Sequence, residues 1–253
     1  MRFFWFDEKD VLIHTTNVVL REPDIQIEAF SEEHSITAPE EQREDDAGTE
    51  TVITEDTVDQ SDLETSVPFT AQAPFGEWND PVFQNGCEEA SLVMVAHWLS
   101  DIPLTKAVAK QEILALADFE EKWLGHSVDT SVVDTLRLFQ DYYTTPAGEV
   151  RMDIERTDIQ EALAEGFVVI VPVDGRKLQN PHFRQPGPER HMLVIVGYDA
   201  STEQFIAHDP GTRYGERYRY ASRVLFDAIG DYPTGDHLPV KTSRKAMIRI
   251  KKL

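Results

Sequence analysis

The sequence of 253 residues predicts an α+β fold, in which helices come first and a mostly antiparallel sheet follows. Two observations lead to this class. Between residues 87 and 166, apolar residues recur at helical spacing between polar caps and glycines. From residue 167 onward, short apolar runs separated by polar turns take their place, which is typical of strands. No internal repeat of about 20–50 residues is visible, so a repeat architecture is excluded.

Four helices are expected before residue 167. The first, from Cys87 or Glu88 to about Leu99, is apolar on nearly all sides, which predicts a helix buried inside the domain. The other three run from the N-cap Thr105 to Leu124 with Gly125 as C-cap, from Thr130 or Ser131 to Tyr143, and from a cap at Thr157 or Asp158 to Gly166.

Five strands are expected after that point, at residues 167–173, 192–196, 204–208, 217–220 and 246–250. A short helix over residues 221–229 precedes the last of them. Before the first helix, residues 67–70 are expected to be extended, and residues 73–86 contain enough Pro, Gly and Asn to predict a loop. We therefore expect one folded domain over residues 67–253.

Residues 1–66 differ in composition from this domain. They carry 19 acidic and 4 basic side chains, which is a net charge of −15 out of −22 for the whole chain. Such a segment buries too little apolar area to offset its ordering entropy, so we expect it to be disordered. Its removal should then leave the domain folded. A segment that folds only on binding a partner is the alternative.

The charge and the single cysteine exclude several kinds of protein. Nucleic-acid binding relies largely on Lys and Arg contacts to phosphate, so a chain this acidic is not expected to bind nucleic acid. One cysteine allows neither an intramolecular disulfide nor a multi-cysteine metal site. No apolar stretch approaches the roughly 20 residues of a membrane-spanning helix, and the apolar residues 1–6 are too few for a secretory signal. Localisation and oligomeric state stay open.

Cys87 is the candidate nucleophile, because it stands where a loop becomes the buried helix. Unpaired N–H groups at a helix N-terminus stabilise a thiolate, so we expect a depressed pKa for Cys87 and alkylation already near pH 6. Glu88 and Glu89 follow directly, and their charges would raise the pKa of the thiol unless both side chains point away. The alternative is an inert core cysteine, which is the more common role of a lone cysteine.

His191 is the candidate base among eight histidines, because it lies at the start of an apolar strand and borders the long loop 174–190. Asp209 follows the next strand. If the two strands form a hairpin, Asp209 lies beside His191, and we expect its carboxylate to hold the Nδ1–H of the imidazole. An ordinary strand-edge histidine and a turn-forming aspartate before Pro210 are the alternatives.

Cys, His and Asp in this order resemble the papain-like cysteine peptidases, and in particular the C39-like peptidases. The resemblance rests on Val-Pro-Phe-Thr-Ala-Gln at 67–72, Gly-Cys-Glu-Glu-Ala-Ser at 86–91, the run from His191 through Gly197-Tyr198 to Asp199, and Asp209-Pro210. It covers about residues 67–250 and implies a papain-like fold, in which the buried helix carries the nucleophile and packs on the sheet.

The resemblance also implies the role of each site residue. Cys87 is the nucleophile, His191 the base, and Asp209 the group that orients the base. A glutamine side-chain amide helps to form the oxyanion hole, and by motif this is Gln72. The 14 residues between Gln72 and Cys87 are more than the family usually has, so Gln84, three residues before Cys87, is the alternative.

The activity that the resemblance implies is hydrolysis of peptide bonds in a peptide or protein substrate, without a cofactor. Acyl transfer on the same site, as in a transpeptidase or amidase, and a catalytically silent peptide-binding module are the alternatives. The loop 174–190 is locally basic, with Arg176, Lys177, Arg184 and Arg190. It can favour acidic substrates or bind the acidic N-terminal segment.

Overall fold

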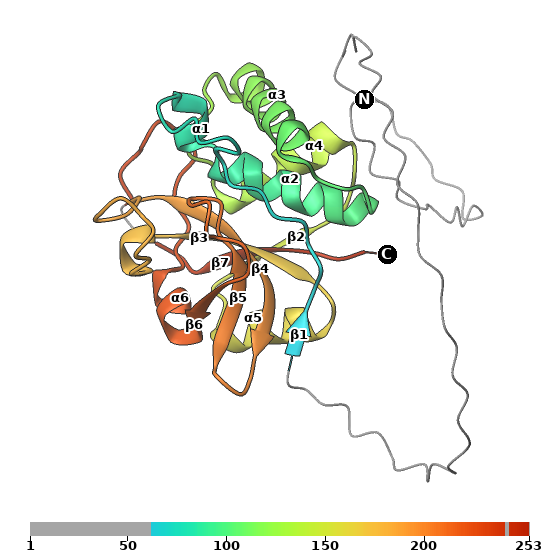
Figure 1. Cartoon of the computed structure of the whole chain (residues 1–253), viewed down its shortest axis with the longest axis vertical. Helices are drawn as coiled ribbons and strands as arrows, with labels where there is room; N and C mark the ends of the chain where they lie inside the picture. The colour runs from blue at the N-terminus through green and yellow to red at the C-terminus, as the bar shows by residue number, and fades with distance from the viewer. Residues whose placement is uncertain (1–61, 241–242, 253) are drawn as a thin grey trace, which may run out of the picture.

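A computed structural model describes residues 62–240 and 243–252, which form a seven-stranded sheet with helices on both of its faces. The strand order is β2-β7-β3-β4-β5-β6, β1 pairs with β4, and all pairings are antiparallel (Figure 1). The predicted α+β class is confirmed. The expected disorder of the acidic segment concerns residues 1–61, which lie outside the described residues.

All five expected strands are present. The strands of the sheet are β1 (Asp62–Glu64), β2 (Glu149–Met152), β3 (Val168–Val173), β4 (His191–Asp199), β5 (Gln204–His208), β6 (Tyr218–Ala221) and β7 (Ala246–Ile250). β1 and β2 were not predicted from the sequence. Both are short, and β2 is only half-buried at every second residue, so its apolar pattern is weak.

The helices also follow the expected order. They are α1 (Pro81–Asn85), α2 (Cys87–Ser100), α3 (Lys106–Leu124), α4 (Val132–Tyr143), α5 (Arg156–Ala164) and α6 (Ser222–Ala228), with a 3-10 turn η1 (Gly175–Lys177). Thr105 and Ser131 cap α3 and α4 as predicted. Two details were wrong. Glu155 caps α5 through a capping box with Asp158, and the expected loop 73–86 contains α1, capped by Asp80.

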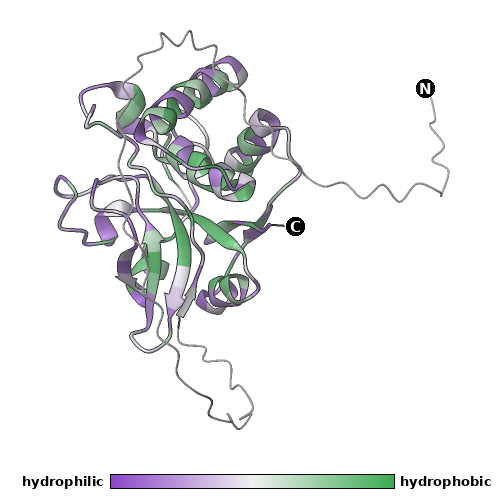
Figure 2. Cartoon of the chain, turned by 45° about the vertical axis from the view of Figure 1, so that its right-hand side comes forward, coloured by the Kyte–Doolittle hydropathy of each residue, from purple (hydrophilic) through white to green (hydrophobic). Residues whose placement is uncertain are grey.

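The sheet lies between two sets of helices, and its strands alternate between two apolar cores (Figures 1 and 2). On β3, Val168 and Ile170 face the core formed with α2, α3 and α4, whereas Val169 and Val171 face the core formed with α5 and α6. This period of two is the normal geometry of a strand covered on both faces. It explains why β3 and β4 are continuous apolar runs.

Helix α2 is the central helix of the first core. Every residue from Cys87 to Trp98 is buried, which confirms the prediction from its all-round apolar sequence. The helix packs on α3, α4 and β4. Its first residue is therefore fixed by the core against the sheet, while the loop before it, which includes α1, stays at the surface. None of the helices in the described ranges is long and apolar enough to cross a membrane.

Strand β1 extends the sheet beyond the boundary expected at Val67. Residues 62–64 pair with residues 197–199 of β4, where β3 has already ended. The backbone N–H of Thr65 donates to the carbonyl of Val196 at 2.8 Å, and Glu64 forms an ion pair with Arg217. Residues 62–66, which were expected to belong to the disordered segment, are thus part of the described fold.

Two shortened chains test the contribution of β1. A chain beginning at Asp62 should keep the melting temperature of the full chain, because the acidic composition of residues 1–61 predicts little burial. A chain beginning at Val67 loses the β1 pairing and the Glu64–Arg217 ion pair, and should melt about 3–8 °C lower, as expected for a loss of about 1–2 kcal/mol in a domain of this size. Thermal unfolding followed by circular dichroism measures both. Equal melting temperatures for the two shortened chains would show that β1 adds no stability.

Candidate active site

Cys87, His191 and Gln72 line one cleft of about 780 Å³. Cys87 is the first residue of α2, His191 is the first residue of β4, and Gln72 lies in the segment that precedes α1. Asp209 lies behind His191, fully buried, directly after β5. The fold therefore brings together residues that are more than a hundred positions apart in the sequence, at the point where a helix N-terminus meets the first residue of a strand.

The pairing of His191 with Asp209 is direct. β4 and β5 form the expected hairpin, with Val194 opposite His208, and this register places Asp209 beside the start of β4. Nε2 of His191 lies 2.7 Å from Oδ1 of Asp209. The expectation that Asp209 holds Nδ1 is wrong, because the ring presents Nε2 to the carboxylate. Nδ1 is thus the nitrogen left for a substrate or a thiol.

Asp209 is held as a carboxylate by its surroundings. Burial alone raises its pKa, but His191 and hydrogen bonds from Tyr220 and the backbone of Gly211 lower the pKa below its usual value. An ionised carboxylate only accepts hydrogen bonds, so Nε2 of His191 carries the proton in this pair. In a neutral ring with its proton on Nε2, Nδ1 is the unprotonated nitrogen, which is the form that a base requires.

Two further residues that the sequence analysis missed hold the far oxygen of Asp209. The hydroxyl of Tyr220 donates to Oδ2 at 2.5 Å, and Nδ2 of Asn180 lies 3.4 Å from the same oxygen. Asn180 also donates to the oxygen of Tyr220 at 2.7 Å. The only sequence signal for Tyr220 was its place on an expected strand next to β5. Asn180, in a loop, had no signal.

Gly211 lets the backbone approach the imidazole closely. A Cβ at this position would lie 2.9 Å from Cε1 of His191 and 3.0 Å from the ring of Phe183, too close for any other residue. Its backbone N–H donates to Oδ1 of Asp209 at 3.0 Å. The ring of Phe183 meets the ring of His191 edge-on, with centroids 5.5 Å apart. The orientation of His191 is therefore fixed on several sides by packing.

Cys87 rests as a thiol. Its Sγ–H donates to Oε2 of Glu88 at 2.8 Å, so Glu88 does not point away. Burial, and then the charge of Glu88, raise the pKa of Cys87 well above its ordinary value, while a backbone hydrogen bond from Met192 opposes them. The expected depressed pKa is therefore wrong for the resting site. The contact with Met192 places the thiol beside the residue that follows His191.

Glu88 is itself a buried and well-held carboxyl group. Its Oε1 accepts a hydrogen bond from the hydroxyl of Tyr232 at 2.8 Å and lies 3.4 Å from the backbone N–H of Thr130. Burial raises the pKa of Glu88, while the hydrogen bonds from Cys87 and Tyr232 lower it. The side chain is thus fixed with one oxygen toward Tyr232 and the other toward the thiol.

Two further buried carboxyl groups, those of Glu89 and Glu120, lie near Glu88. Burial and mutual repulsion raise the pKa values of Glu89 and Glu120, whose side chains are hydrogen-bonded to each other. Two carboxyl groups can share a hydrogen bond only when one of them carries a proton, so this contact requires a proton on Glu89 or Glu120. At least one of the acidic side chains behind Cys87 is therefore neutral near pH 7.

Replacing Glu88 by glutamine is expected to make Cys87 more reactive. Oε1 can keep its bonds to Tyr232 and Thr130, and the new amide N–H then faces Sγ, where it stabilises a thiolate. We expect iodoacetamide alkylation at pH 7 to accelerate about tenfold or more. In the wild-type protein, alkylation should keep rising from about pH 7 to about pH 9 without a plateau, because the raised pKa lies above this window.

The matched control is Glu121→Gln, which removes an exposed carboxylate from α3. It should leave the alkylation rate of Cys87 unchanged. A wild-type rate that is already maximal at pH 6, or a Glu88→Gln protein that reacts no faster than the wild type, contradicts the hydrogen bond as the cause of the raised pKa.

The two glutamines have different surroundings. Gln72 is buried, and its Nε2 donates at 2.9 Å to the carbonyl of Phe83 and at 2.9 Å to that of Gln84. Its Oε1 has no hydrogen-bond partner among the described residues. Gln84 is exposed, and its Nε2 donates to the carbonyl of Trp78 at 2.8 Å. Gln72 thus ties the end of α1 to the preceding segment, and both glutamines line the cleft.

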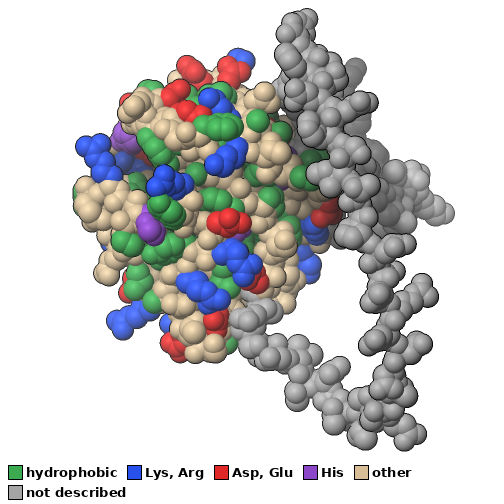
Figure 3. All heavy atoms as spheres, viewed as in Figure 1, with side chains coloured by type: hydrophobic (Ala, Val, Ile, Leu, Met, Phe, Trp, Pro, Cys, Tyr) green, Lys and Arg blue, Asp and Glu red, His purple; other side chains and the backbone are tan. Residues whose placement is uncertain are grey.

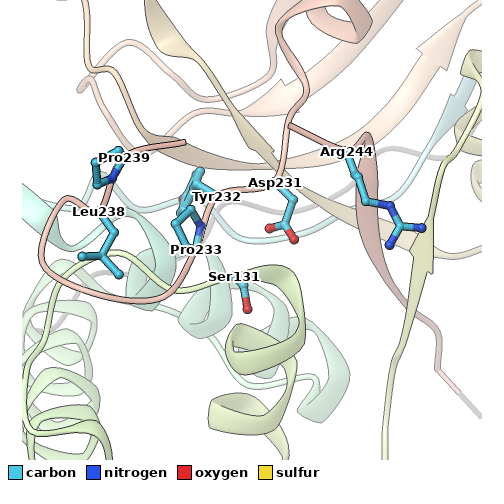
Figure 4. A pocket seen from close by; sticks show the side chains of 7 residues that line it. All are labelled: Ser131, Asp231, Tyr232, Pro233, Leu238, Pro239 and Arg244. Carbon is cyan, nitrogen blue, oxygen red and sulfur yellow. The ribbon is translucent and has the colours of Figure 1, made fainter. Parts of the chain in front are cut away.

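A second hollow, of about 540 Å³, lies near residues 231–239 (Figure 4). Figure 4 shows Tyr232 and Pro233 between Leu238 and Asp231, with Ser131 below them and Arg244 to one side. Tyr232 connects this region to the cleft, because its hydroxyl binds Glu88. The lining of this hollow contains neither a cysteine nor a histidine. Within the described ranges, no group of three His, Cys, Asp or Glu side chains is placed to hold a metal ion.

Comparison with known proteins defines the class. Residues 64–231 match the model of the Peptidase_C39 like family, and the chain belongs to this family. Among solved structures, it is similar to the crystal structure of a Bacillus anthracis protein assigned as a C39-like peptidase, with 15% identity and a TM-score of 0.45. That match covers 74% of this chain and 96% of the other. No curated protein matches the chain. The expected family is thus confirmed.

Proposed function

We propose that the protein is a cysteine peptidase, in which Cys87 attacks a peptide carbonyl and His191 moves the proton. The observation that supports the proposal is the cleft that Cys87 and His191 both line, with Nε2 of His191 hydrogen-bonded to the buried Asp209. This arrangement leaves Nδ1 as the proton acceptor. Membership of the C39-like family supports the same chemistry.

The proposed reaction runs in two halves. Nδ1 of His191 takes the proton of the Cys87 thiol, and Sγ bonds to the substrate carbonyl carbon. The C–N bond then breaks as His191 returns the proton to the leaving nitrogen, which leaves a thioester on Cys87. Water attacks this thioester with His191 as base, and the C–S bond breaks to release the carboxylic product and the thiol.

Because the thiol of Cys87 is hydrogen-bonded to Glu88 at rest, one further step must precede this reaction. Its proton points to Glu88, so Cys87 must turn from Oε2 of Glu88 toward Nδ1 of His191 when substrate enters the cleft. A substrate that displaces water also strengthens the attraction between the thiolate and the imidazolium, because the local dielectric falls. The protein would then keep its nucleophile protonated until the cleft is filled.

The proposed oxyanion donors are the side-chain amide of Gln72 and the backbone N–H of Cys87. Donors of this kind contribute about 3–4 kcal/mol each to transition-state stabilisation. In the resting site, both amide protons of Gln72 are used by the carbonyls of Phe83 and Gln84. Gln72 would therefore have to release one of them, and the short distance from α1 to Cys87 makes this a local movement. Gln84 remains the alternative donor.

The experiment that tests the function is digestion of a diverse peptide mixture by the full chain, with the products identified by mass spectrometry. A peptidase produces pairs of fragments that gain one water at the cleaved bond. Addition of a primary amine at high concentration separates hydrolysis from acyl transfer, because a transferase would give amide products in place of acids. The absence of any cleavage or transfer in this mixture would contradict the proposal.

A further inference from the structure

The cleft around Cys87 is basic, although the chain has 46 acidic and only 24 basic side chains. Apart from His191, the Lys, Arg and His residues that line it are His182, Arg184, Arg190 and Arg213. No Asp or Glu belongs to the lining. Figure 3 shows Lys, Arg and His side chains gathered at the margin between α1 and the strands. A surface drawn at random from this composition would contain more carboxylates than guanidinium groups.

An adjoining hollow of about 540 Å³ has the same character. It shares Trp78 and Arg213 with the cleft, and its other charged residue is Lys106. It too contains no carboxylate. The two hollows together form an extended groove whose walls are aromatic and cationic. A groove of this length accommodates several residues of an extended peptide on either side of the thiol.

Two of these arginines are free to bind a ligand. Arg190 is already engaged: its side chain is largely buried, its Nε lies 3.3 Å from Oδ2 of Asp129, and it donates to the carbonyl of Leu238. Arg184 and Arg213 are exposed, and no carboxylate among the described residues pairs with either. Arg213 is held against the ring of Tyr214, 4.6 Å from its centroid, which fixes the guanidinium at the edge of the groove.

We propose that this groove binds acidic peptide segments, with carboxylate side chains of the substrate held by Arg184 and Arg213. The inference rests on the proposed function, because it gives the substrate class of the same site. The planar guanidinium fork suits a carboxylate, and no acidic side chain in the lining competes for either arginine. Arg213 donates one N–H to the hydroxyl of Tyr214, and its other N–H groups can reach a ligand. The net charge of the protein is −22, so an acidic peptide is repelled elsewhere on the molecule and is attracted only where the surface is locally basic.

The acidic segment of the chain itself has the same chemistry. It enters the described structure at β1, beside the far end of β4, whereas the groove lies at the first residue of β4. Nine residues of strand, about 30 Å, separate the two ends. The 61 residues before β1 are long enough to span this distance, so distance does not decide the occupant. We assign the groove to a separate acidic substrate because the proposed peptidase must release and replace its ligand, and the experiment includes an arm for the chain's own segment.

Binding is measured with the full-length Cys87→Ala protein, so that no turnover is needed. Three fluorescent peptides of equal length are compared by anisotropy: one with Asp and Glu, one with Asn and Gln in their places, and one with Lys. We expect the acidic peptide to bind at least about tenfold more tightly than the neutral one. Arg184→Glu and Arg213→Glu should each reduce this affinity about tenfold, and the double variant should favour the Lys peptide.

Arg223→Glu is the matched control, because Arg223 is exposed on α6 and pairs with Asp227 outside the groove. It should leave all three affinities unchanged. Equal binding of acidic and neutral peptides, or an equal effect of Arg223→Glu, overturns the inference. If acidic peptides bind but the wild-type protein cleaves none of them, the proposed function fails and the inference stands. If the wild-type protein cleaves neutral peptides as well as acidic ones, the proposed function stands and the inference fails.

The remaining arm replaces the acidic side chains of residues 40–46 by their amides in the full-length Cys87→Ala protein. The affinity for the acidic peptide should not change. Binding that appears only after this replacement would show that the chain's own segment fills the groove, and would overturn the assignment to a separate substrate.

Discussion

Replacing Cys87 by alanine is expected to abolish peptide hydrolysis, with kcat falling by at least about 10⁴-fold. Cys87 is the only thiol of the chain, so no neighbouring sulfur can take its place. Replacing Cys87 by serine separates chemistry from folding. The serine hydroxyl can still donate to Glu88, which keeps the buried carboxylate partnered, but it is a far weaker nucleophile at this site.

Both Cys87 variants should therefore be inactive, and the serine variant should keep the melting temperature of the wild type. Initial rates on a peptide cleaved by the wild type measure the first effect, and thermal unfolding measures the second. Activity above about one hundredth of the wild-type rate in folded Cys87→Ala protein would mean that another group is the nucleophile.

Replacing His191 by alanine is expected to reduce kcat/KM by at least about 10³-fold, because the thiol then loses its proposed base. Replacing Asp209 by asparagine should cost less, about 10- to 100-fold. The side-chain oxygen of an asparagine can still accept a hydrogen bond from Nε2–H of His191, but the negative charge that stabilises the imidazolium is lost. The carboxylate also loses its role as acceptor for Tyr220 and Asn180, and this part of the effect depends on side-chain rearrangement.

Tyr220→Phe provides the matched control for this series. It removes the hydroxyl that donates to Asp209 but leaves the contact between Asp209 and His191. Its effect on kcat/KM should be smaller than that of Asp209→Asn. An Asp209→Asn protein with full activity, or a His191→Ala protein that loses less than Tyr220→Phe, is incompatible with the proposed roles.

The fold could be predicted from local patterns where those patterns are strong. The caps Thr105 and Ser131 and the all-round apolar sequence of α2 placed three helices within one residue of their observed ends. β1 and β2 could not be predicted in this way. A strand of three or four residues carries too little periodicity, and β1 exists because β4 extends beyond β3 and leaves an edge to fill.

The candidate site also has a part that local sequence patterns predict and a part that they do not. Cys87, His191 and Asp209 became candidates because each stands at the boundary of a predictable element, and the β4–β5 hairpin brings the last two together. The ring nitrogen that meets Asp209 could not be predicted, since it depends on a side-chain rotamer set by Phe183 and Gly211.

The behaviour of Glu88 also lies beyond local reasoning. The position of Glu88 next to Cys87 is visible in the sequence, and on an exposed helix its carboxylate would point into the solvent. Because α2 is buried, the side chain of Glu88 cannot point into the solvent. The hydroxyl of Tyr232, 144 residues later in the chain, holds this side chain against the thiol of Cys87. The raised pKa of Cys87 is therefore a consequence of tertiary packing.

The most direct test of the central claim is covalent labelling of Cys87 by a peptide that carries an epoxide in place of the scissile bond. The wild-type protein should gain the mass of one peptide, located on Cys87 by fragmentation, because the groove aligns the epoxide with the sulfur and His191 takes the thiol proton. Under the same conditions, His191→Ala should gain none. Labelling that is equally fast in the His191→Ala protein, or absent from the wild type while iodoacetamide still modifies Cys87, would contradict the account.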